Sequence, residues 1–71
     1  MRDEFEEARA LFDEAVRRYG RAKTEFEAIQ RTLDERVSAG KVVTVSDLDA
    51  EELARIDFLY AREWLSRHHL A

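Results

Sequence analysis

A chain of 71 residues has room for one domain, and stability at this length usually requires disulfides, a bound metal or a second chain. Cysteine is absent, which excludes disulfides and thiolate metal sites and gives no support for secretion, so we expect a cytoplasmic protein that association stabilises. The net charge of −4 argues against general nucleic-acid binding, and no apolar run approaches the roughly 20 residues that span a membrane.

Apolar residues in the first half of the chain follow an unbroken heptad pattern, with gaps that alternate between three and four residues. This spacing is typical of a helix that packs along another helix, and it predicts a long helix over residues 3–39. One position of the repeat carries large side chains and the other carries mostly alanine, which favours an antiparallel neighbour over a symmetric parallel coiled coil. The large residues are Phe5, Phe12, Tyr19, Phe26 and Leu33, and the others are Ala8, Ala15, Ala22 and Ile29.

Gly20 lies inside this predicted helix, where a glycine costs about 1 kcal/mol relative to alanine. An alternative interpretation ends one helix at Gly20 and begins another near Thr24, which produces a three-helix bundle. We favour the continuous helix because Tyr19, Ala22 and Phe26 keep the heptad phase across the glycine.

The first helix is expected to end at Gly40, which suits the left-handed conformation that closes many helices. The next segment, residues 41–45, is rich in valine and threonine, whose β-branched side chains favour an extended backbone. We expect this segment to be a connector whose valines either cover the end of a helical bundle or contact a partner.

A second, shorter helix is expected over residues 47–69. Its start is indicated by a capping box in which Asp49 caps the first turn and Glu52 bonds back to it, and Ser46 offers a second cap slightly earlier. The two helices together predict an all-α fold, in which one antiparallel helical hairpin over residues 1–71 assembles as a dimer into a helical bundle.

The second helix carries an apolar arc of about 200°, wider than the arc of about 100° that one neighbour requires. Tyr60 and Trp64 lie one turn apart on this arc and are candidate anchors for a partner. Asp57 lies near its middle, where we expect a buried carboxylate that pairs with a cation or a hydroxyl group and makes the contact specific.

The second helix is also expected to be too short to cover the first. Beside a helix of about 30 Å, the N-terminal part of a helix about 55 Å long projects freely. An uncovered apolar stripe of this kind is typical of an interaction surface. The residues of the predicted stripe are Phe5, Ala8, Leu11, Phe12, Ala15, Val16 and Tyr19.

One basic cluster, made of Arg17, Arg18, Arg21 and Lys23, interrupts the acidic sequence. It could grip phosphates as a nucleic-acid-binding regulator does. Acidic residues four positions away from each member also explain the cluster as a solvated helix face with intrahelical ion pairs, and we favour this interpretation. The expected pairs are Asp13–Arg17, Glu14–Arg18, Arg21–Glu25 and Lys23–Glu27.

No serine, histidine and acid are spaced to form a nucleophilic site, and a hairpin offers no deep pocket. We therefore expect no catalytic, cofactor-binding or metal-binding residue, no small-molecule substrate and no membrane contact. The sequence predicts a non-enzymatic helical protein that acts through protein–protein contacts. Its partner is expected to be a second copy of itself, or a larger protein to which it attaches as a small adaptor, inhibitor or chaperone-like subunit.

Overall fold

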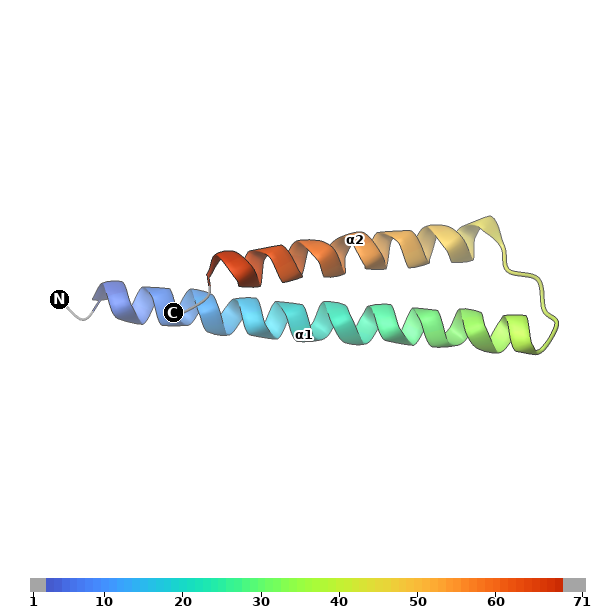
Figure 1. Ribbon diagram of the computed structural model, residues 1–71, viewed down its shortest axis with the longest axis horizontal. Helices are drawn as coiled ribbons and strands as arrows, with labels where there is room; N and C mark the ends of the chain where they lie inside the picture. Colours follow the sequence, from blue (N-terminus) through green and yellow to red (C-terminus); the bar gives the residue numbers. More distant parts are fainter. Residues whose placement is uncertain (1–2, 69–71) are drawn as a thin grey trace.

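The protein is a hairpin of two long helices, as the computed structural model shows for residues 3–68 (Figure 1). Helix α1 spans Asp3–Ser38 and helix α2 spans Val45–Arg67. The two helices run antiparallel and side by side, and α1 projects past the end of α2 at its blue, N-terminal end (Figure 1). The predicted all-α hairpin is confirmed, and α1 passes through Gly20 without interruption.

The seam of α1 that faces α2 is the heptad stripe read from the sequence. Ala15 and Ala22 are 0% and 3% exposed, and the larger stripe residues Phe12, Tyr19 and Phe26 are half-buried beside them. Alanine at these positions lets the backbone of a neighbouring helix approach closely, while the aromatic rings fill the space on either side. The core of the hairpin is therefore narrow and consists of small residues at its centre.

Helix α2 meets this seam with four residues that also follow a heptad spacing. Ala61 is 0% exposed, and Ala54, Phe58 and Leu65 are half-buried. The ring of Phe58 lies between two rings of α1, with its centroid 5.4 Å from that of Tyr19 and 5.6 Å from that of Phe26. Because Tyr19 and Phe26 are one heptad apart on α1, this three-ring contact fixes the register of the two helices.

Helix α1 ends in the way that its sequence predicts. Gly40 has φ of +71°, in the left-handed region that favours glycine. Its N–H donates to the carbonyl of Val37 at 3.1 Å, and the N–H of Lys41 donates to the carbonyl of Arg36 at 2.8 Å. These two bonds form a Schellman motif, which satisfies carbonyls that the end of the helix would otherwise leave open.

Helix α2 begins two residues earlier than expected, and the predicted cap at Asp49 is wrong. Thr44 is the N-cap: its hydroxyl accepts from the N–H of Asp47 at 3.1 Å, and the Asp47 carboxylate accepts from the N–H of Thr44 at 3.0 Å. Arg36 of α1 forms an ion pair with the same carboxylate. This contact joins the capping box of Thr44 and Asp47 to helix α1.

The uncovered part of α1 is shorter than predicted. Helix α2 has 23 residues and α1 has 36, so α2 follows α1 for about 35 Å and leaves about 20 Å uncovered. The predicted stripe is wrong at its C-terminal end, because Ala15 is fully buried and the ring of Tyr19 packs on Phe58. The connection between the helices is short, so α2 packs on α1 from its first turn onward and nearly all of α2 covers α1.

Candidate interaction surfaces

The remaining N-terminal stripe is the first of three exposed apolar surfaces. Phe5 is 65% exposed and Val16 is 43% exposed, and both lie on one side of α1 within about 20° of each other. Leu11, 41% exposed, lies on the other side of the seam. Ala8 and Phe12 are half-buried. The stripe therefore offers an apolar edge at the free end of α1, rather than the continuous face that the sequence predicts.

The second surface is the outer face of α2, which we define as Leu53, Ile56, Tyr60 and Trp64. These side chains are 68%, 46%, 66% and 36% exposed. They lie on the half of the wide apolar arc that points away from the seam, because only Ala54, Phe58, Ala61 and Leu65 are needed against α1. Two candidate anchors of the sequence analysis, Tyr60 and Trp64, are thus accessible in the hairpin, and Leu53 and Ile56 join them.

The third surface lies around the turn, and sequence reasoning anticipated only part of it. Val42 and Val45 are 81% and 74% exposed, and Val37 and Leu48 are also exposed. The expected cover for the end of the bundle is absent in the described hairpin, since only Val43 of the connector is half-buried. The signal for Val37 and Leu48 was present in the sequence as apolar residues outside the heptad stripe.

Asp57 is exposed in the single hairpin, and its burial and pairing across an interface with a partner stay a prediction. It lies about 70° away from the α2 seam, because α2 uses Ala54, Phe58 and Ala61 there rather than the centre of its apolar arc. Asp57 lines a hollow between the helices with Arg18 and Arg21 of α1. Opposite charges therefore face one another along this edge of the seam.

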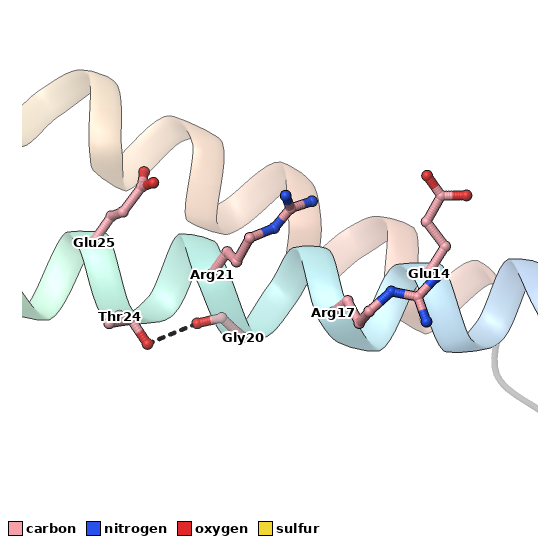
Figure 2. A pocket seen from close by; sticks show the side chains of 6 residues that line it. All are labelled: Glu14, Arg17, Gly20, Arg21, Thr24 and Glu25. Atoms are coloured by element: carbon pink, nitrogen blue, oxygen red, sulfur yellow. Dashed lines mark hydrogen bonds between the residues drawn. The ribbon is translucent and has the colours of Figure 1, made fainter.

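The basic cluster lies on the exposed side of α1, and two of its members, Arg17 and Arg21, line the hollow at Gly20 (Figure 2). The hollow has a volume of about 730 Å³ and includes Glu14 and Glu25 in its lining as well as Arg17 and Arg21. The Thr24 hydroxyl donates to the carbonyl of Gly20 at 2.9 Å (Figure 2). Gly20 has no side chain, which leaves the floor of the hollow open, and charged side chains of both signs line it.

The ion pairs between described residues lie mostly on α2. Glu51 pairs with Arg55, and Glu63 pairs with Arg67 at 2.9 Å, each across one helical turn. The four pairs expected within α1 are not among the pairs that join described residues, and that expectation is wrong. Exposed ion pairs of this kind contribute little to the free energy of unfolding, because their formation restricts the rotamers of two long side chains.

Folding lowers the pKa of the Asp47 carboxyl. The N–H of Thr44 and the guanidinium of Arg36 hold the pKa of the Asp47 carboxyl below its usual value, with the Thr44 hydrogen bond as the larger cause. Both interactions favour the ionised form. The charge on Asp47 is thus tied both to the start of α2 and to the contact with α1.

Within residues 3–68, no group of three or more histidines, aspartates and glutamates is placed to hold a metal ion. The helices of the described region are neither long nor apolar enough to cross a membrane. Comparison of the chain with protein-family models, with curated proteins and with solved structures finds no match.

Proposed function

We propose that this protein is not an enzyme and that it acts by binding another protein through its helices. The partner is a second copy of the chain or a larger protein of which it is a small adaptor, inhibitor or chaperone-like subunit. Three exposed apolar surfaces on one small hairpin support the proposal, because monomeric soluble proteins rarely leave so much large apolar surface uncovered.

The observation that carries the proposal is the total exposed area. A compact monomer of 8.4 kDa exposes about 4,600 Å², by the scaling of accessible surface with mass, whereas this chain exposes 5870 Å². The surplus of about 1,300 Å² exceeds the roughly 800 Å² that each partner buries in a stable interface of standard size. A second protein is the simplest way to cover it, and the chain has no cysteine for a disulfide that could stabilise the hairpin instead.

Light scattering of the full chain at micromolar concentration tests the proposal. We expect a mass at least twice the 8.4 kDa of the chain, with a helical circular dichroism spectrum. A cooperatively folded monomer would contradict self-association, since it would show that the hairpin is stable with its apolar surfaces in water, and would leave only a larger protein as the partner.

A second candidate function is nucleic-acid binding by the basic cluster. The exposure of Arg17, Arg18, Arg21 and Lys23 favours it, because phosphate contacts require accessible cations. Glu14 and Glu25 line the same surface, and the chain carries a net charge of −4. We therefore expect no shift of RNA or DNA in a binding assay at physiological salt. Binding that weakens steeply as salt rises would favour this candidate.

A further inference from the structure

The outer face of α2 has the shape of a helix-packing surface. Leu53, Ile56, Tyr60 and Trp64 fall within an arc of about 80°, and that arc is centred about 125° from the seam that packs on α1. All four are exposed. An arc of this width suits one further helix, and its direction leaves the contact with α1 undisturbed.

The same face is nearly symmetric about its middle. Ile56 and Tyr60 lie two residues on either side of position 58, and Leu53 and Trp64 lie five and six residues from it. In a two-fold interface, if a residue of one copy contacts a second residue of the other copy, the same contact occurs again with the copies exchanged. If two α2 helices meet antiparallel at this point, Ile56 lies opposite Tyr60 and Leu53 lies opposite Trp64. Each contact then occurs twice and joins an aliphatic with an aromatic side chain.

The charges at the two ends of the face favour the antiparallel orientation. Asp49 and Arg67 are exposed and lie nine residues on either side of position 58. They are 18 residues apart, which is five turns of an α-helix, so they lie on one side of it. An antiparallel pair places Asp49 of one copy near Arg67 of the other, whereas a parallel pair would place like charges together. Arg67 already meets Glu63 at 2.9 Å, and its guanidinium has donors left for a second carboxylate.

From this complementarity we infer that a second copy of the chain docks on the outer face of α2, with the two α2 helices antiparallel about an axis near position 58. The inference rests on the proposed function and names its partner and surface. The surplus area of about 1,300 Å² per chain leaves room for such an interface. The N-terminal stripe and the valines of the turn lie outside it.

Two leucines on the same helix provide a matched test of the surface. Leu53 and Leu59 are 68% and 50% exposed, but Leu59 lies about 100° from the centre of the outer face. We expect Leu53→Asp to halve the mass measured by light scattering, with helical circular dichroism retained, and Leu59→Asp to leave the dimeric mass unchanged. A folded Leu53→Asp variant that keeps the dimeric mass would overturn the inference.

Cysteine pairs test the orientation even if an aspartate variant fails to fold. The chain has no cysteine, so any disulfide comes from the introduced residues. We expect Leu53→Cys and Trp64→Cys to stay uncrosslinked when each is oxidised alone, because the two copies of either residue lie roughly 15 Å apart along antiparallel helices. An equilibrated mixture of the two is expected to form a covalent dimer. Crosslinking of each variant with itself, and no disulfide that joins Leu53→Cys to Trp64→Cys in the mixture, would indicate a parallel pair and contradict the inference.

The two proposals fail in different ways. If the unmodified chain has a monomeric mass, this inference is wrong, and the proposed function then requires a larger protein as the partner. If it is a dimer, but Leu53→Asp stays dimeric and the mixed cysteines do not crosslink, the chain associates through another surface and only this inference is wrong.

Discussion

The two glycines of the chain occupy opposite backbone environments. Gly40 has φ of +71°, where an L side chain is strained, whereas Gly20 is an ordinary helical residue. A Cβ built at Gly20 meets no atom within 4 Å. Glycine at position 20 therefore has no steric requirement in the single hairpin, and its backbone freedom costs stability there.

Exchange of each glycine for alanine should change stability in opposite directions. Gly20→Ala is expected to raise the free energy of unfolding by up to about 1 kcal/mol, through helix propensity and a less flexible unfolded chain. Gly40→Ala is expected to lower it by about 1–2 kcal/mol, because alanine is strained in the left-handed region. Urea denaturation of the two variants measures both. Destabilisation by Gly20→Ala would point instead to a break in α1 at that position, as in a three-helix bundle.

Asp47 should make stability depend on acid pH. Its pKa is lowered in the folded chain, so the stabilisation is fully present above the usual aspartate pKa of about 3.9 and is lost as pH falls through the lower, folded-state pKa. We expect the stability difference between the parent chain and Asp47→Asn to be largest near neutral pH and to shrink below about pH 4. Denaturation between pH 2 and pH 7 measures it.

Arg36→Gln serves as the companion variant for this titration. It should reduce the pH dependence without abolishing it, since the larger cause, the Thr44 hydrogen bond, remains. A difference between parent and Asp47→Asn that does not vary with pH would show that the carboxylate does not stabilise the fold through its charge.

Each helix was predictable from a different kind of signal. The periodicity of α1 specified its length, its continuity through Gly20 and the buried position Ala22, because the other faces of α1 are mostly charged. The apolar arc of α2 is too wide to indicate which part meets α1. The choice of Phe58 and Ala61 over Tyr60 and Trp64 depends on the rings of Tyr19 and Phe26 across the seam, which lie far away in the sequence.

The cap of α2 shows the same limit. The sequence analysis considered caps at Ser46 and Asp49, whereas the structure uses Thr44 with Asp47, whose carboxylate also pairs with Arg36 of the other helix. A pattern that is local in sequence contains no information about that contact. The exposure of Asp57 in the hairpin could not be predicted from the sequence either, because it depends on how α2 is rotated about its axis relative to α1.

Phe58 should contribute more to the pairing of the helices than any exposed apolar residue of α2. Phe58→Ala removes the ring that joins Tyr19 to Phe26 and is expected to lower the free energy of unfolding by about 2 kcal/mol, less than for a fully buried phenylalanine. Leu59→Ala, on the exposed side, should change it by less than about 0.5 kcal/mol. Thermal or urea denaturation compares them, and equal effects would place the Phe58 ring outside the core.

At the scale of the whole molecule, stability should depend on protein concentration. If association covers the surplus surface, a 100-fold increase in concentration adds about 1.4 kcal/mol per chain of a dimer. This corresponds to a rise in melting temperature of roughly 5–10 °C for a domain of this size. Calorimetry or circular dichroism over that range measures the shift. A melting temperature that stays constant would be incompatible with a dimer that forms as the chain folds.

The alanines at the centre of the seam invert the usual pattern of mutational tolerance. In most proteins the core is damaged chiefly by truncation, because large side chains leave cavities. Here Ala15, Ala22 and Ala61 have almost nothing to remove, and the described residues include no large side chain that is fully buried. Any enlargement at these three positions must push two backbones apart along their length. We expect selection on this chain to act as an upper limit on volume at these three positions, so that residues smaller than leucine persist there while the charged outer surface of α1 varies freely.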